Sequence, residues 1–384
     1  MNVRIVSMVA TIQKICISLS ILFLISCSSS VKKVSSAAPN YTDSLKYAKG
    51  FTVEYFDSYI RLSVINPWET SQLYARYYLT KDSTTHIPSD GVRVQIPIKR
   101  IALGSATQFE FISLIGEMNS VIGVCDVKRI YSPEILERIA DGKATDLGDP
   151  FQMNYERLIS LRPEAVMMSG YNKVDEYSKR VQQVGVTVVY NNEWMENSLL
   201  ARAEWIKLIA LLYDKKELAD SLFDDIESRY IDLKSSLSQA NDKVTILPGD
   251  NFRGTWYMPG GNSFMANLYK EAGADYFYQS DSTRGSIPID YETALVKFGN
   301  AQVWIGATAK TLDELGQMNE RNRLFAAFRN KQVYSIDNRT TESGGNDYWE
   351  SAVARPDLLL ADFIRALHPD LLPNHQLIYL KKLE

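Results

Sequence analysis

Hydroxyl, aromatic and basic residues follow several predicted strands, and their types suit contact with a large flat organic molecule. Trp and Tyr rings offer rigid contact area with a polar edge, and arginine pairs with carboxylate or catecholate oxygens. Loops after strands are also where open α/β sheets bind their ligands. The candidate ligand contacts are Thr107, Tyr171, Trp194, Arg253, Trp256, Tyr257, Arg284, Tyr348 and Trp349. For each aromatic side chain, packing beneath its own loop is the alternative.

Two glutamates, Glu156 and Glu292, begin predicted helices in different halves of the chain. A carboxylate in the first turn of a helix interacts favourably with the helix dipole, so capping alone explains each of them. Their surroundings match, because each follows a tyrosine and precedes a glycine by fourteen residues, at Gly170 and Gly306. This faint repeat predicts two related lobes with a carboxylate at an equivalent place on each.

Signatures of catalysis and of transition-metal binding are missing from the sequence. The three histidines, His86, His368 and His375, are scattered, and there is no H-x-x-x-H, C-x-x-C, phosphate-binding loop or G-x-S-x-G motif. Cys125 lies in the apolar stretch 121–125, which predicts a small buried side chain rather than a nucleophile. The formal net charge of −4 argues against a nucleic-acid partner.

The N-terminus has the pattern of a secretion signal. An apolar run at 15–25 is too short to span a membrane and ends in Leu24-Ile25-Ser26-Cys27, which resembles the lipobox of bacterial lipoproteins. We therefore expect residues 1–26 to be removed, Cys27 to carry the lipid and residues 27–49 to form a tether. An ordinary signal peptide with an incidental cysteine is the alternative. The mature chain would keep Cys125 alone, so no intrachain disulfide is expected.

The remaining sequence predicts an α/β protein with two Rossmann-like lobes, central mostly parallel sheets and additional N-terminal antiparallel strands. Residues 50–80 alternate apolar and polar positions, as a half-exposed strand pair does. Strands and helices alternate from residue 92 to 190, and again from 244 to 367. Only helical patterning fills 198–239, and residues 215–239 would form one helix of about 37 Å. The predicted boundaries are 50–197 for the N-terminal lobe, 198–240 for a helical linker and 241–384 for the C-terminal lobe.

Residues 153–166, M-N-Y-E-R-L-I-S-L-R-P-E-A-V, resemble a characteristic block of one protein family. That family is the substrate-binding proteins of ABC importers for iron siderophores, haem and cobalamin, the class III periplasmic binding proteins. Residues 97–102 are similar to its opening strand, and 254–261 and 344–355 to segments of its lipoprotein branch. The resemblance covers about residues 92–370, which leaves 50–90 as an additional N-terminal piece.

The resemblance implies two lobes joined by a rigid helix, with the ligand held in the cleft and little closure on binding. It also implies that Glu156 and Glu292 dock into arginines of the membrane permease. We therefore expect a non-enzymatic, monomeric lipoprotein in the periplasm, anchored to a membrane through Cys27. It would deliver a metal chelate to an ABC permease and its ATPase, with no resident cofactor. Direct binding of an iron ion, an enzyme or chelate-remodelling protein on this scaffold, and a structural lipoprotein remain alternatives, and no residue pattern identifies one ligand.

Overall fold

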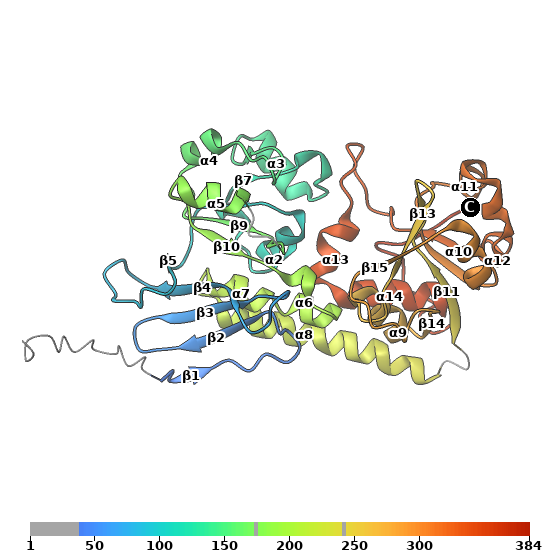
Figure 1. The fold of residues 1–384 in the computed structure, drawn as a ribbon, viewed down its shortest axis with the longest axis horizontal. Helices are drawn as coiled ribbons and strands as arrows, with labels where there is room; N and C mark the ends of the chain where they lie inside the picture. The colour runs from blue at the N-terminus through green and yellow to red at the C-terminus, as the bar shows by residue number, and fades with distance from the viewer. Residues whose placement is uncertain (1–37, 173–175, 240–242) are drawn as a thin grey trace, which may run out of the picture. The chain divides into compact units, whose positions relative to one another are not determined.

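The structure is a computed structural model that describes residues 38–172, 176–239 and 243–384 (Figure 1). The predicted signal peptide at 1–26, the lipidation site Cys27 and residues 28–37 of the predicted tether lie outside these ranges. Among the described residues, no helix combines the length and apolarity needed to cross a membrane.

The first part of the chain forms a five-stranded sheet in the order β1-β2-β3-β4-β5. Strands β1 to β4 pair antiparallel, and β5 runs parallel to β4. In β2, Phe51 and Val53 are buried while Thr52 is exposed, which is the alternation of a sheet with one covered face. The bounds are Tyr41–Thr42, Phe51–Tyr55, Ile60–Ile65, Leu73–Thr80 and Val92–Gln95. The prediction of N-terminal antiparallel strands is confirmed, with more strands than the expected pair.

The N-terminal lobe is built on a parallel sheet in the order β10-β9-β6-β7-β8. Its strands are Ile101–Leu103 (β6), Val121–Val124 (β7), Thr145–Asp146 (β8), Ala165–Met168 (β9) and Val188–Tyr190 (β10), and its helices are Phe109–Leu114 (α2), Pro133–Ala140 (α3), Tyr155–Leu161 (α4) and Glu176–Gln183 (α5). Short 3-10 turns occupy Ala106–Gln108 (η1), Met118–Ser120 (η2), Val127–Arg129 (η3) and Glu193–Met195 (η4). Asn154 accepts the amide of Arg157 at 3.0 Å and so caps the start of α4.

The sequence predicts a strand over residues 92–103 that Pro97 breaks or edges. The structure has the break: residues 92–95 form β5 of the N-terminal sheet and residues 101–103 form β6 of the lobe. Pro97 stands between them, and a proline cannot donate a backbone hydrogen bond to a neighbouring strand. The break therefore separates the additional sheet from the lobe that follows it.

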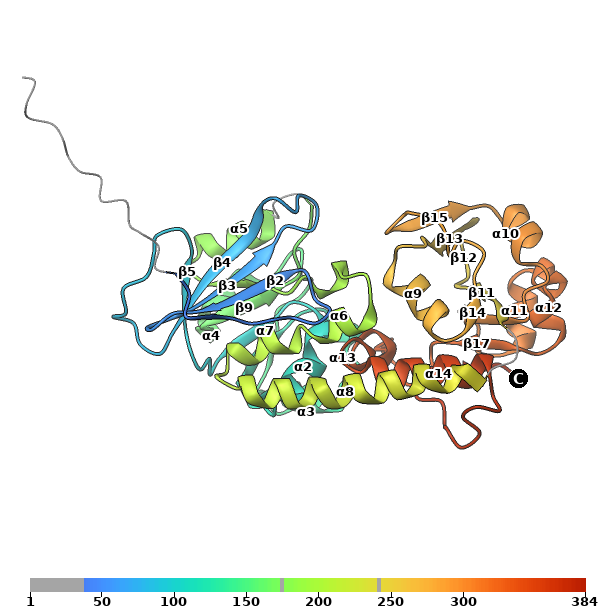
Figure 2. The ribbon, with the colours of Figure 1, turned by 90° about the horizontal axis from the view of Figure 1, so that it is seen from below.

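The helical segment expected at 198–239 is confirmed. It contains α6 (Leu199–Ala203), α7 (Ile206–Leu211), α8 (Lys216–Ser236) and the 3-10 turn η5 (Leu237–Gln239). Helix α8 packs against α7 near its start and against α14 further along (Figure 2). Its Ala219 and Phe223 belong to the apolar core of the N-terminal lobe, whereas Tyr230 belongs to that of the C-terminal lobe. One continuous helix therefore enters both cores.

The C-terminal lobe repeats the architecture with a sheet in the order β14-β11-β16-β17-β18, parallel except for its last strand. The strands are Val244–Pro248 (β11), Ala274–Asp275 (β14), Val303–Ala307 (β16), Val333–Ser335 (β17) and Lys381–Lys382 (β18). The helices are Phe264–Glu271 (α9), Tyr291–Phe298 (α10), Leu312–Met318 (α11), Ala326–Arg329 (α12), Ser351–Ala354 (α13) and Pro356–Leu367 (α14), with 3-10 turns at Glu320–Leu324 (η6) and Asp347–Trp349 (η7). The predicted α/β fold of two lobes is confirmed.

A small antiparallel sheet in the C-terminal lobe departs from the sequence prediction. Residues 253–257 were expected to be a loop, but Asn251–Phe252 (β12) and Thr255–Pro259 (β13) form a hairpin. Strand β13 also pairs with Ser286–Ile289 (β15). Trp256 and Met258 point to the covered side, and Tyr257 between them is exposed, which is the period-two pattern of a strand.

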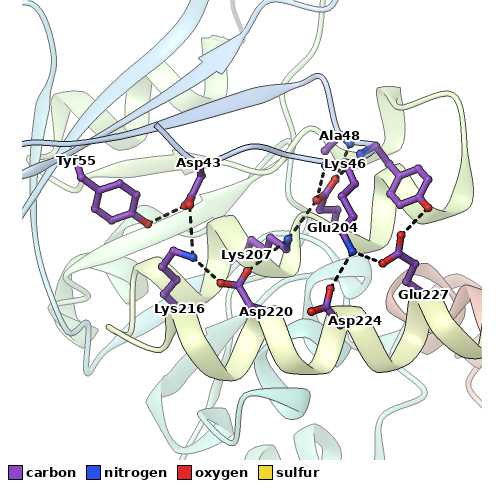
Figure 3. A network of polar contacts seen from close by, with 11 residues as sticks. Asp43, Lys46, Ala48, Tyr55, Glu204, Lys207, Lys216, Asp220, Asp224 and Glu227 are labelled. Carbon is purple, nitrogen blue, oxygen red and sulfur yellow. Dashed lines mark hydrogen bonds and ion pairs between the residues drawn. The ribbon is translucent and has the colours of Figure 1, made fainter. Parts of the chain in front are cut away.

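The segment before β2 is held to the helices by buried carboxylates. Glu204 is fully buried and accepts the backbone amides of Lys46, Tyr47 and Ala48 at 2.9, 2.8 and 2.8 Å. The Lys46 ammonium reaches Asp224 and Glu227 of α8 at 3.1 and 2.5 Å (Figure 3). The chain is therefore attached firmly to the helical segment at the point where the predicted tether ends.

The two lobes also touch at the start of α3. Gly345 approaches the backbone there so closely that a Cβ atom would lie 2.1 Å from the carbonyl oxygen of Ile130. The carboxylate of Glu350 accepts the amides of Tyr131 and Ser132, the latter at 2.9 Å. Arg339 donates to the Tyr131 hydroxyl at 3.1 Å. The C-terminal lobe therefore caps a helix of the N-terminal lobe.

Candidate ligand-binding cleft

A cavity of about 500 Å³ lies between the lobes, at the carboxyl ends of strands β6, β7 and β9. This is the edge of a parallel sheet where ligands bind in open α/β folds. Its volume falls in the range of small-molecule sites. The lining residues from the N-terminal lobe are Gly104–Thr107, Cys125, Asp126, Arg129, Pro150, Phe151, Met168, Ser169 and Tyr171, and the C-terminal lobe adds Gly344, Asn346 and Trp349. We call this cavity the main pocket.

The polar floor of the main pocket is the turn after β6. Ser105 caps the 3-10 turn η1, and its hydroxyl lies 3.1 Å from that of Thr107. Cys125 is buried beside this turn, and burial raises the pKa of its thiol to about 12. At neutral pH the thiol is therefore protonated, which makes it a poor nucleophile and a poor metal ligand. The prediction that Cys125 is buried is confirmed, and Thr107, a candidate ligand contact, lines the main pocket.

Aromatic rings from both lobes face the main pocket. Phe151 and Tyr171 of the N-terminal lobe are each 39% exposed and lie 5.3 Å apart between ring centroids. Trp349 comes from the C-terminal lobe and is 55% exposed. Trp194 does not line the pocket but packs behind Tyr171 at 5.9 Å. Partly exposed rings that line a cavity suit contact with a flat organic ligand.

Charge in the main pocket is limited to one acid and one base. Asp126 has a left-handed backbone conformation at the end of β7, and its carboxylate lies 3.4 Å from the Arg129 guanidinium. Both side chains are well exposed at this pair. Within the described ranges, no three side chains of His, Cys, Asp or Glu come together to hold a metal ion. This composition suits a neutral or mildly anionic organic molecule better than a bare cation.

Arg284 of the C-terminal lobe lines a second, smaller cavity, where it faces Asn192 and Glu196 of the N-terminal lobe. Three of the nine candidate contacts, Thr107, Tyr171 and Trp349, therefore line the main pocket, and Arg284 lines a neighbouring one.

Two candidate contacts are buried in the C-terminal core instead of lining a pocket. Trp256 is 0% exposed, donates from its indole nitrogen to the Pro248 carbonyl at 2.8 Å and packs against Trp304. Tyr348 is 7% exposed, and its hydroxyl contacts the Met265 sulfur at 3.5 Å. The structure contradicts the expectation that these rings face a ligand, because the residues around them already cover them. Both side chains instead pack beneath their own segments, which was the alternative interpretation of the sequence.

Arg253 and Tyr257 are exposed but lie on the β12–β13 hairpin, outside both cavities. Arg253 occupies the turn with a φ of 53° and stacks over Phe252. Tyr257 is on the outer face of β13. Neither side chain reaches a described pocket, so these two candidates do not join the others.

A family model described as periplasmic binding protein matches residues 101–340. The chain belongs to the periplasmic binding protein family. Two uncharacterized lipoproteins of Methanocaldococcus jannaschii are similar to this binding protein: one is 27% identical over 86% of this chain and 83% of its own length, and the other is 27% identical over 74% and 73%.

Solved structures show the same fold at low identity. A haem-binding protein from Pseudomonas aeruginosa aligns with a TM-score of 0.54 and 15% identity over 75% of this chain and 98% of that one. The vitamin B12 binding protein of Vibrio cholerae aligns with a TM-score of 0.53 and 14% identity, over 73% and 99%. These similarities confirm the fold, and the family model confirms the family resemblance.

The two glutamates of this binding protein occupy the predicted positions on their helices. Glu156 is in the first turn of α4, and Glu292 is in the first turn of α10, one on each lobe. Both side chains are exposed, and Glu292 forms an ion pair with Arg321 at 2.7 Å. Their role in docking stays a proposal.

Several residues of the cleft were not among the candidates. Phe151, Asp126 and Arg129 all follow strands of the parallel sheet. A position in a loop after such a strand is the signal that identified Tyr171, and it applies equally to these three residues. Trp68 packs against Trp194 at 6.1 Å from the N-terminal sheet. Its sequence gives no signal for that contact, because the two residues meet only through the tertiary fold.

Proposed function

We propose that this protein captures an organic metal chelate in the cleft and delivers it to an ABC permease. The observation that carries the proposal is the main pocket, with Phe151 and Tyr171 on one lobe and Trp349 on the other. A flat macrocycle or catecholate would gain contact area on both sides from such rings. A carrier needs only to bind and release such a ligand.

The ligand classes we propose are a ferric siderophore, haem or cobalamin. Structural neighbours support the class, including the vitamin B12 binding protein, the haem-binding protein and an ABC-type ferric hydroxamate transport protein from Saccharomonospora viridis. An iron ion bound directly would need several oxygen or nitrogen ligands. The main pocket offers Asp126 already paired with Arg129 and a protonated Cys125, which favours the chelate.

We further propose that the protein works outside the cytoplasm, anchored by lipid on Cys27. The lipobox pattern and the similar lipoproteins support this location. Glu156 and Glu292, one on each lobe, would contact arginines of the permease. Charge contacts of this kind contribute orientation and association rate more than affinity, which suits a partner that must detach after delivery.

Ligand retention tests the function. Purified protein is incubated with haemin, cyanocobalamin or a ferric hydroxamate and passed through a desalting column. Native mass spectrometry and visible absorption then report what stays bound. We expect one of the three to remain at one molecule per chain. Retention of free Fe³⁺ with none of the chelates would instead support the direct-ion alternative.

A further inference from the structure

The second cavity, of about 120 Å³, borders the N-terminal sheet. Asn192 in its lining accepts the amide of Gly170, which precedes Tyr171 of the main pocket. The lining residues of the second cavity are Lys49, Gly50, Ile65, Pro67, Thr70, Asn192, Met195, Glu196, Asn197 and Arg284. We call it the side pocket. Trp194 links it to the main pocket, because its ring contacts Tyr171, which lines the main pocket, and Trp68, whose neighbour Pro67 lines the side pocket.

The N-terminal sheet also positions a residue of the main pocket. The Tyr74 hydroxyl, on β4, accepts the backbone amide of Tyr171 and donates to its carbonyl, both at 3.0 Å. Gly170 allows this approach, since a Cβ there would lie 2.7 Å from atoms of Tyr74 and Asn192. Tyr74 in turn packs against Trp68 at 5.8 Å. The sheet that precedes the family-matched region is therefore built into one wall of the cleft.

Asn192 carries a donor that the described protein leaves without a partner. The side chain is 2% exposed, and its Oδ1 accepts the amide of Gly170 at 2.7 Å. Its Nδ2 has no hydrogen-bond partner among the described residues, and the residue lines the side pocket. A buried amide donor without a partner is unfavourable, so an occupant that accepts this bond would be favoured.

The other charges around the side pocket favour an occupant with oxygen atoms. Lys49 and Arg284 are exposed cations on its rim. Glu196 is the acidic residue in the lining, and its Oε1 already accepts the amides of Lys49 and Gly50 and the indole of Trp205, at 3.0, 2.8 and 3.0 Å. Carboxylate or amide oxygens would therefore meet donors and positive charge here.

We propose that the N-terminal sheet is part of the ligand site, and that the side pocket holds an oxygen-bearing arm, a carboxylate or an amide, of the chelate bound in the main pocket. The inference rests on the proposed function and extends it. Haem carries carboxylate arms and cobalamin carries amide arms, whereas the metal-binding part of either would lie between the rings of the main pocket. Trp68, Thr70 and Asn192 then contribute to ligand choice.

Three variants of the full-length, detergent-solubilised protein test this inference. Trp68→Ala removes a ring from the wall, and Thr70→Trp fills the side pocket from an exposed position. Asn192→Asp keeps an oxygen for the Gly170 amide but replaces the donor with a second acceptor. Tyr41→Ala is the control, since Tyr41 is a 56% exposed aromatic residue on the same sheet and lines neither pocket.

Dissociation constants are measured by titration with haemin, cyanocobalamin and a ferric hydroxamate. For the probe that the unmodified protein binds most tightly, we expect each of the three variants to raise Kd about tenfold, as truncation of a central contact does, and Tyr41→Ala to leave it unchanged. If Trp349→Ala weakens binding while Trp68→Ala, Thr70→Trp and Asn192→Asp do not, the side pocket is empty of ligand and this inference alone is overturned. If the unmodified protein binds none of the probes, the proposed function is overturned with it.

Discussion

The carboxylate of Glu350, just before α13, accepts the backbone amide of Ser132 at 2.9 Å and so caps α3 of the opposite lobe. The side chain is only 2% exposed. Loss of water around it raises the pKa of the carboxyl to about 7, and Asp347 and Glu110 nearby act in the same direction. Arg339 and Arg355 line the same small cavity as Glu350. A contact between the lobes thus depends on a group that titrates near neutral pH.

We predict that Glu350 makes stability decrease as pH rises. Its pKa in the folded state, about 7, lies above the ordinary value of about 4.3, so the folded protein binds more protons between these values. The contribution is fully present below about pH 4 and is lost as pH rises through about 7. Glu350→Gln removes this dependence, which is worth at most on the order of 3 kcal/mol. Urea unfolding of the unmodified protein and of the Glu350→Gln variant at pH 5 and pH 8 measures this dependence. An equal change in the free energy of unfolding of the two proteins between these pH values would contradict the prediction.

Substitution of Trp256 should reduce the stability of the fold, whereas substitution of Trp349 should weaken ligand binding. Trp256→Ala empties a fully buried site and should destabilise the fold by about 3–5 kcal/mol, with unchanged ligand affinity in the protein that remains folded. Trp349→Ala removes a ring that is 55% exposed in the main pocket. We expect it to leave the melting temperature nearly unchanged and to raise Kd about tenfold. Thermal unfolding and ligand titration of both variants decide between the two roles.

Glu156→Ala combined with Glu292→Ala should abolish chelate uptake and leave ligand affinity intact. Both carboxylates are exposed on the first turns of their helices, away from the residues that line the main pocket. Glu176→Ala with Asp313→Ala is the matched control, since these exposed acids also occupy first helical turns. Uptake is measured in cells that depend on this transporter. Normal uptake by the first pair, or an equal loss in the control, would remove the docking role.

Loss of the Glu204 carboxylate should lower the free energy of unfolding far more than loss of the nearby Asp224 carboxylate. Glu204→Ala leaves the amides of Lys46, Tyr47 and Ala48 without their acceptor in a buried place, which should cost about 3–5 kcal/mol. Asp224→Ala removes one exposed partner of Lys46, 61% accessible at its side chain, and should cost less than about 1 kcal/mol. Urea denaturation compares them. Equal losses would mean that the N-terminal segment is not held by the buried carboxylate.

Cys27→Ser should release the protein from membranes. The prediction rests on the lipobox pattern, because serine has no thiol to receive the lipid. Fractionation of cells by ultracentrifugation measures it, and Cys125→Ser is the control because that thiol is buried in the folded protein. If the Cys27 variant stays in the membrane fraction, another part of the chain holds it there.

Local signals in the sequence predicted most of the regular fold. The Asn154 cap, the Ser132-Pro133 start of α3 and the apolar spacing of α8 are each visible within one turn or a few turns of chain. The β12–β13–β15 sheet was missed because β13 and β15 are separated by residues 260–285, and pairing at that distance has no local signature. The alternation of Trp256, Tyr257 and Met258 is nevertheless the period-two pattern of a strand, although these residues were expected to form a loop and Trp256 was expected to face a ligand.

The sequence predicted where the candidate site lies, but not which residues line it. Tyr171 and Thr107 follow strands of the parallel sheet, and the topology brings such loops to one edge. Composition alone could not distinguish an exposed Trp349 from a buried Tyr348 beside it, because that difference depends on which face of a short turn meets the core. Asn192 lines the side pocket and Trp68 packs against Trp194 through contacts between distant segments, which the sequence does not encode locally.

Gly345 limits how this scaffold can be redesigned. Any other amino acid there would place a Cβ atom against the Ile130 carbonyl and wedge the surfaces apart. A library that aims at a new specificity can therefore randomise Phe151, Tyr171 and Trp349, whose side chains are partly open to solvent. Position 345 has to remain glycine in every member of the library. A side chain there would change the distance between the two lobes, and so the geometry of the pocket in which the other substitutions lie.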